Sequence, residues 1–67
     1  MESVWVNGTA VDVPSGKSVA ELVDEYSDRR TGIAVAVNQS VLTKAEWAQT
    51  TLRPGDRVEI VSATQGG

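Results

Sequence analysis

The chain ends in Gly66-Gly67, and the free carboxylate of Gly67 is the group in this sequence best placed for chemistry. Residues 63–67 are small or polar, and fully extended they span at most about 17 Å. Glycine has no Cβ, so this backbone can pass close to the walls of a channel. We therefore expect Thr64, Gln65 and Gly66 to present Gly67 to a partner's active site. The alternative is a frayed end without function, because the last residues of most domains are loosely ordered.

The residue types that usually carry catalysis are missing from this sequence. It has 67 residues with no cysteine and no histidine, which removes thiol nucleophiles, disulfides and the usual general base near neutral pH. We expect a protein that is not itself an enzyme, that binds no metal or cofactor and that is monomeric alone. The net charge of −3 argues against a nucleic-acid partner, which favours a basic face.

No apolar stretch approaches the roughly 18 residues of a membrane span, and the N-terminus lacks the pattern of a signal peptide. These two features predict a cytoplasmic protein without a membrane partner.

Two strands and a turn open the chain. Residues 4–6 and Thr9–Val13 flank Asn7-Gly8, and Asn-Gly is the strongest two-residue signal for a hairpin, because both positions of a type I′ turn need positive φ. Since side chains alternate along a strand, Val4 and Val6 share one face and Trp5 lies on the other.

One amphipathic helix follows the break at residues 14–17. Ser18 and Glu21 form a capping box, in which each side chain serves the backbone amide of the other residue. The apolar stripe at helical spacing comprises Val19, Leu22, Val23 and Tyr26. We expect the helix to end near Ser27 or Asp28, before the polar loop 28–32.

The second half contains two strands and a short helical turn. Residues 33–37 alternate larger apolar side chains with Ala34 and Ala36, and a turn at 38–40 leads to a short segment at 41–42. A second capping box at 43–46 opens a helical turn, in which Trp47 is expected to fill the core. Residues 53–56 form a tight turn, and 57–61 form the last strand with Val58 and Ile60 inward.

This order of elements predicts an α+β fold of the β-grasp, or ubiquitin-like, type. One helix covers one face of a mixed sheet of four or five strands, with a right-handed crossover through the helix if the flanking strands run parallel. We expect a domain at 1–62 and a flexible tail at 63–67, with the last strand delivering the C-terminus off the edge of the sheet.

The face of the sheet without the helix is predicted to be the docking face for partners. It carries the outward side chains Trp5, Ala34, Ala36 and Val61, and exposed apolar patches mark docking sites. The alternatives are a normal scatter of apolar surface residues, or a slip of one residue in register that would turn Trp5 inward.

With these elements in place, the chain resembles the ThiS-type sulfur carrier proteins of thiamine biosynthesis, within the ThiS/MoaD group of ubiquitin-like proteins. The resemblance covers nearly the whole chain. Its more specific parts are the Val37-Asn38 step, the position of Trp47 and the Gly55-Asp56 turn. The other matching residues are Val6-Asn7-Gly8, Pro14-Ser15-Gly16, Ser18-Val19, Leu22, residues 33–36, Val41, Leu52, Pro54, residues 58–61 and Gly66-Gly67.

The resemblance implies a mechanism centred on Gly67. A ThiF-like adenylating enzyme of the ubiquitin-activating type would use ATP and Mg²⁺ to convert the carboxylate into an acyl-adenylate. A cysteine desulfurase or rhodanese-type donor would then supply the sulfur of a thiocarboxylate, and thiazole synthase would accept that sulfur. Three alternatives remain: a carrier for another acceptor (molybdopterin, tRNA thiolation, cysteine or natural-product sulfur), a ubiquitin-like protein modifier, and a non-covalent binding module.

Overall fold

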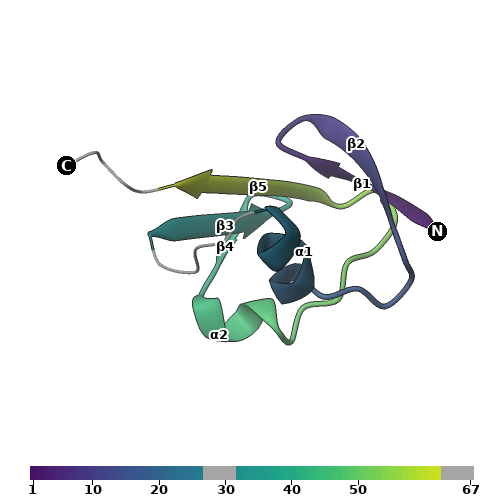
Figure 1. Cartoon of the computed structure of the whole chain (residues 1–67). Helices are drawn as coiled ribbons and strands as arrows, with labels where there is room; N and C mark the ends of the chain where they lie inside the picture. The colour runs from purple at the N-terminus through teal and green to yellow at the C-terminus, as the bar shows by residue number, and fades with distance from the viewer. Residues whose placement is uncertain (27–31, 63–67) are drawn as a thin grey trace.

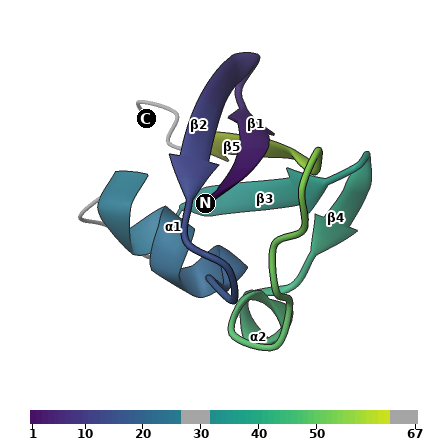
Figure 2. The ribbon, with the colours of Figure 1, turned by 90° about the vertical axis from the view of Figure 1, so that its right-hand side faces the viewer.

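The computed structural model describes residues 1–26 and 32–62, which form one mixed sheet with helices on one side (Figure 1). The strands are β1 (Glu2–Val6), β2 (Thr9–Val13), β3 (Ile33–Val37), β4 (Ser40–Leu42) and β5 (Arg57–Ser62), and the helices are α1 (Val19–Tyr26) and α2 (Lys44–Trp47). Figures 1 and 2 show α1 and α2 on the same side of the sheet. This is the predicted β-grasp arrangement, with five strands.

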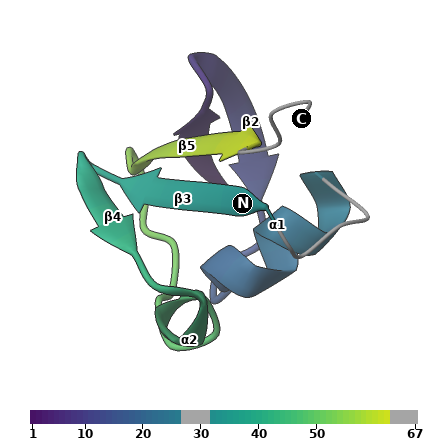
Figure 3. The same ribbon diagram turned by 90° about the vertical axis from the view of Figure 1, so that its left-hand side faces the viewer.

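The strands lie in the order β2-β1-β5-β3-β4 (Figure 2), and Figure 3 shows β5, β3 and β4 from the opposite side. β5 runs parallel to β1 and antiparallel to β3, so the last strand is the middle strand of the sheet. The expectation that the chain leaves from an edge strand is therefore wrong. A strand with partners on both sides holds its backbone more firmly than an edge strand, because the backbone bonds in both directions.

Both hairpins of the sheet turn through residues in the left-handed region. Asn7 and Gly8 have φ of 51° and 84°, which confirms the predicted type I′ geometry. The β3–β4 turn repeats this geometry at Asn38 and Gln39, with φ of 52° and 73°. Gln39 has a Cβ and is disfavoured at positive φ, so the residue types at this turn did not predict its geometry.

Both predicted capping boxes are present. The Ser18 amide donates to Glu21 Oε1 at 2.9 Å, and the Glu21 amide donates to Ser18 Oγ at 3.1 Å. At α2 the Thr43 amide donates to Glu46 Oε1 at 2.7 Å, and the Glu46 amide donates to Thr43 Oγ1 at 3.3 Å. Each box satisfies amide groups that the first turn of a helix leaves without an intrahelical partner.

The core lies between the sheet and the two helices. Its buried residues are Val4, Val6, Val13, Val19, Leu22, Val23, Val35, Trp47, Leu52 and Val58. Trp47 is buried, as expected, but Tyr26 at the end of the α1 stripe is 46% exposed. The prediction that Tyr26 belongs to the buried stripe is therefore wrong, and a tyrosine ring tolerates this position because its hydroxyl remains well hydrated at the surface. The end of the helix region predicted at 27–28 and the loop 28–31 lie outside the described residues.

The segment between α2 and β5 packs against the N-terminal end of α1 and contributes to the core. The Leu52 amide donates to the Lys17 carbonyl at 2.8 Å, and the Val19 amide donates to the Thr50 carbonyl at 2.9 Å. These bonds fix Leu52 under the start of α1, where its side chain is buried. The predicted turn at 53–56 follows, with Gly55 at φ of 83° and the Asp56 amide donating to the Arg53 carbonyl.

Candidate functional site

β5 directly precedes the predicted reactive end of the chain. Thr64, Gln65, Gly66 and Gly67 lie outside the described residues, so their predicted roles stay predictions. Toward β3, β5 is paired from Val58, opposite Val37, to Ser62, opposite Ile33. Toward β1, its strand pairing covers only Arg57 and Val58, which lie opposite Trp5 and Val6. Beyond Val58, the side of β5 that faces β1 has no strand partner.

The side chain of Asn7 holds β5 where β1 ends. Its Oδ1 accepts from the Ile60 amide at 2.9 Å, and its Nδ2 donates to the Ile60 carbonyl at 3.1 Å. The Asn7 backbone amide also donates to the Val58 carbonyl at 2.9 Å. A carboxamide has the same donor and acceptor as a peptide group, so Asn7 acts as one further residue of the parallel ladder.

Asn38 plays the matching part at the other end of β5. Its Oδ1 accepts from the Arg57 amide at 3.0 Å, its backbone amide donates to the Arg57 carbonyl at 2.8 Å, and its Nδ2 donates to Asp56 Oδ1 at 3.1 Å. The first residue of each hairpin turn thus fastens β5 from its own side. We call Asn7 and Asn38 the asparagine clamps. The sequence pattern predicts turns at both residues and does not predict this second role.

The four residues predicted to form the docking face lie on the sheet face without helices. Trp5 is 44% exposed and Val61 is 56% exposed. Ala34, opposite Val61, is exposed, and Ala36 is partly covered. The register therefore turns Trp5 outward. Docking itself stays a prediction.

Three further residues on this face were missed. Val41, opposite Ala36, is 75% exposed and joins the apolar group of Ala34, Ala36 and Val61. Arg57 and Glu59 are exposed on β5, with Arg57 opposite Trp5 and Glu59 opposite Ala36. The inward assignment of Val58 and Ile60 could have placed these two charges outward by alternation.

The charges on β5 divide the face into unlike halves. A hollow of about 260 Å³ beside Trp5 is lined by Trp5, Gly8, Arg57, Val58 and Glu59. A second hollow of about 280 Å³ is lined by Asn38, Gln39, Arg57 and Glu59. The face therefore presents an apolar area on the β3–β4 side and an aromatic ring beside charged groups on the β1 side.

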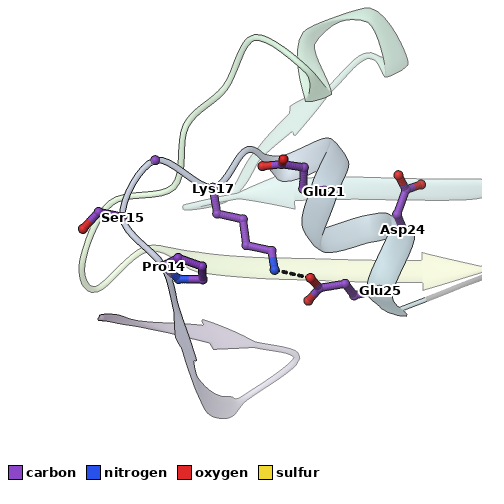
Figure 4. A pocket seen from close by; sticks show the side chains of 7 residues that line it. Pro14, Ser15, Lys17, Glu21, Asp24 and Glu25 are labelled. Carbon is purple, nitrogen blue, oxygen red and sulfur yellow. Dashed lines mark hydrogen bonds and ion pairs between the residues drawn. The ribbon is translucent and has the colours of Figure 1, made fainter.

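A polar depression on the helical side lies between α1 and the segment that follows β2 (Figure 4). Its volume is about 480 Å³, and the Lys17 ammonium within it forms an ion pair with Glu25. Ser15 at its rim donates to Glu2 Oε2 at 3.0 Å. The lysine charge is balanced by Glu25, and the Ser15 hydroxyl is paired with a carboxylate and not with a histidine or lysine base, so this depression lacks the usual parts of a nucleophilic site.

Residues 1–26 and 32–62 contain no group of three or more acidic, histidine or cysteine side chains arranged to hold a metal ion. Within the same residues, neither helix has the length and apolar character that crossing a membrane requires.

Comparison with known proteins gives one consistent result. Residues 4–67 match the model of the ThiS family. The protein named sulfur carrier protein ThiS in Escherichia coli is 31% identical over 64 residues, which cover 96% of this chain and 97% of that protein. The protein of the same name in Thermus thermophilus is 36% identical over 64 residues, covering 96% and 98%.

Solved structures extend the likeness to the fold. The crystal structure of the thiamine biosynthesis protein ThiS from Geobacter metallireducens has a TM-score of 0.79 at 28% identity, covering 97% of this chain and 99% of that chain. A solution structure of a thiamine biosynthesis protein from the same organism has a TM-score of 0.78 at 29% identity, covering 97% and 87%. The predicted fold class is thereby confirmed.

Proposed function

This chain belongs to the ThiS family, and from that membership we propose that it carries sulfur on Gly67 for thiazole formation in thiamine biosynthesis. The observation that carries the proposal is the extent of the family match, which runs from residue 4 through the terminal glycine. Relatives named sulfur carrier protein ThiS, similar over nearly their full length, support it.

The proposed reaction begins at the Gly67 carboxylate, which is a poor electrophile. In a ThiF-like adenylating enzyme that uses ATP and Mg²⁺, a carboxylate oxygen attacks the α-phosphorus of ATP and pyrophosphate leaves. The resulting acyl-adenylate has AMP as its leaving group. A persulfide sulfur, from a cysteine desulfurase or rhodanese-type donor, then attacks the acyl carbon and AMP leaves. Cleavage of the remaining sulfur–sulfur bond by a thiol yields the thiocarboxylate, whose sulfur thiazole synthase accepts.

In this proposal the protein contributes presentation, and no side chain of the chain takes part in bond making. The reacting carbon must reach a site within a partner, and a displacement of about 1 Å can cost on the order of 100-fold in rate. β5 provides a fixed point from which the tail extends, because β3 and the asparagine clamps hold this strand on both sides. A firmly held strand followed by a narrow glycine end suits delivery of a terminus into a channel.

We further propose that the helix-free face docks both the adenylating enzyme and thiazole synthase. Support comes from the apolar group of Ala34, Ala36, Val41 and Val61, in which Ala36 alone is partly covered, and from Trp5 beside Arg57. Partly exposed aromatic and arginine side chains are enriched among residues that dominate binding energy. Gly66, Gln65 and Thr64 would follow the tail into the partner.

The proposal is tested by intact-protein mass spectrometry after incubation with the adenylating enzyme, ATP, Mg²⁺ and a sulfur donor. The wild-type chain is expected to exchange one oxygen for sulfur. Deletion of Gly67 withdraws the carboxylate by up to about 3.5 Å and should abolish the exchange. Addition of one residue after Gly67 should abolish it as well, and Gly66→Ala should reduce it, because the new Cβ narrows the fit.

The matched control is the melting temperature of each tail variant, which should equal that of the wild type. An extended variant that still supports thiazole formation in cells, without being trimmed back to Gly67, contradicts the proposal. A wild-type chain that accumulates as conjugates on lysines of other proteins, with no thiocarboxylate, would instead identify a protein modifier.

A further inference from the structure

Asn7 is chemically reactive because of the residue that follows it, in addition to its role in holding β5. It is followed by Gly8, it lies in an exposed turn, and both residues have positive φ. No hydrogen bond among the described residues engages the Gly8 amide. An asparagine carboxamide next to a free backbone amide that carries no neighbouring Cβ is the arrangement in which the backbone nitrogen can attack the side chain.

We propose that Asn7 is a site of spontaneous deamidation, and that the reaction releases the C-terminal half of β5. The Gly8 nitrogen attacks Cγ of Asn7, forming a carbon–nitrogen bond, while the bond from Cγ to Nδ2 breaks. Nδ2 leaves as ammonia and takes up the proton lost by the Gly8 nitrogen. Water then opens the cyclic imide at one of its two carbonyls, giving either aspartate or isoaspartate at position 7.

The folded state holds this reaction back. Both polar atoms of the Asn7 carboxamide are bonded to the Ile60 backbone, at 2.9 and 3.1 Å. Attack requires Cγ to turn toward the Gly8 nitrogen, which breaks these bonds. Local opening occurs more readily than global unfolding in parts of a protein with few contacts. The rate of modification at Asn7 therefore follows the opening of the bonds between this clamp and β5.

The product cannot restore the clamp. A carboxylate has no donor for the Ile60 carbonyl, and it places negative charge against that oxygen. Isoaspartate also routes the main chain through the side chain and lengthens the turn. Because strand pairing with β1 ends at Val58, the Ile60 carbonyl then loses the donor that holds it on the β1 side.

The chain contains its own matched control at the second clamp. Asn38 has the same φ as Asn7 to within a degree, at 52° and 51°, and also uses its carboxamide to hold β5. The residue after Asn38 is Gln39, whose Cβ obstructs the attack that Gly8 permits. The two sites therefore differ chiefly in the neighbour that supplies the nucleophile.

The test is peptide mapping by mass spectrometry of the full chain, incubated for weeks in mildly alkaline buffer, folded and in urea. Asn7 is expected to convert before Asn38, and to convert faster in urea than in the folded chain. Gln39→Gly should make Asn38 labile in the folded chain, even though glycine relieves the positive φ at position 39. Equal rates at Asn7 and Asn38, or equal rates for Asn7 with and without urea, would overturn the proposal.

The release of β5 is measured with Asn7→Asp, which imitates one product. Its melting temperature should fall by at least about 4 °C, the shift expected from a loss of about 1 kcal/mol in a domain of this size. An unchanged melting temperature would overturn this part. Reduced thiocarboxylate formation by the aged chain rests additionally on the proposed function, whereas mapping and melting are independent of it.

Discussion

The two tryptophans have opposite environments, one in the core and one on the surface. Trp47 is buried in the core, and its Nε1 has no hydrogen-bond partner among the described residues. Trp5 alternates with Val4 and Val6 on β1, so its ring lies on the opposite face, beside Arg57. The residue type therefore does not determine whether a tryptophan is buried. Trp5 is exposed because it alternates with buried residues along β1, and Trp47 is buried because of its position in α2.

Replacing Trp5 by glutamate should weaken the complex with the adenylating enzyme and leave stability nearly unchanged. The new charge lies on the predicted docking face and must be desolvated on binding, which is costly without a partner. Affinity is measured by calorimetric titration and stability by urea unfolding. Ala45→Glu, which adds the same charge on the helical side, is the matched control and should bind as the wild type does. Normal binding by Trp5→Glu would exclude Trp5 from the interface.

At the scale of elements, two features stabilise α1: the capping box at its first turn and the packing of its apolar stripe against the sheet. Val19, Leu22 and Val23 are buried against the sheet, and Ser18 with Glu21 closes the first turn. An eight-residue helix is too short to be stable alone in water, so packing supplies most of its stability.

Leu22→Ala should therefore lower the free energy of unfolding by about 2–5 kcal/mol, the range for deletion of a buried leucine side chain. Tyr26→Ala, on the same stripe but at a half-exposed position, should cost clearly less. Urea unfolding of both variants provides the measurement. A loss for Leu22→Ala no larger than that for Tyr26→Ala would show that the stripe does not face the core.

Elements specified by neighbouring residues could be predicted from the sequence, and contacts between distant ones could not. The Asn7-Gly8 hairpin and the box at Thr43 depend on residues within three positions of one another. The Asn7 clamp joins residues 53 positions apart, and the residues around Ile60 contain no pattern that predicts this contact. Leu52 belongs to no periodic stripe, and its burial follows from the backbone bonds of its segment to α1.

The candidate site divides in the same way. Alternation along β1 and β3 was enough to place Trp5, Ala34 and Ala36 outward. The division of that face by Arg57 and Glu59 depends on β5 lying between β1 and β3, which is a property of strand order. Strand order follows from the packing of the whole chain, so local patterns did not specify it.

At the scale of the molecule, the fold depends on one apolar core and on hydrogen bonds. The ten buried core residues are all apolar, and no buried polar or charged residue occurs among residues 1–26 and 32–61. A domain of this size buries a comparatively small share of its surface and is only marginally stable, and this chain has no cysteine for a disulfide.

We accordingly expect thermal unfolding to be unaffected by a chelator or by a reductant. Circular dichroism in excess EDTA, with and without dithiothreitol, should give the melting temperature found without additions. A metal-dependent fold loses its structure when the metal is withdrawn. A fall in the melting temperature on adding EDTA, reversed by a divalent cation, would contradict this prediction.

The central position of β5 also determines when the protein can fold during its synthesis. β5 is synthesised after the other four strands that the structure describes, and until it is available the β1–β2 and β3–β4 hairpins have no strand between them. An isolated hairpin is marginally stable at best in water, so the nascent chain stays open to proteases. A polypeptide that stops short of β5 cannot complete the sheet. A chain that has folded has therefore been synthesised at least through β5.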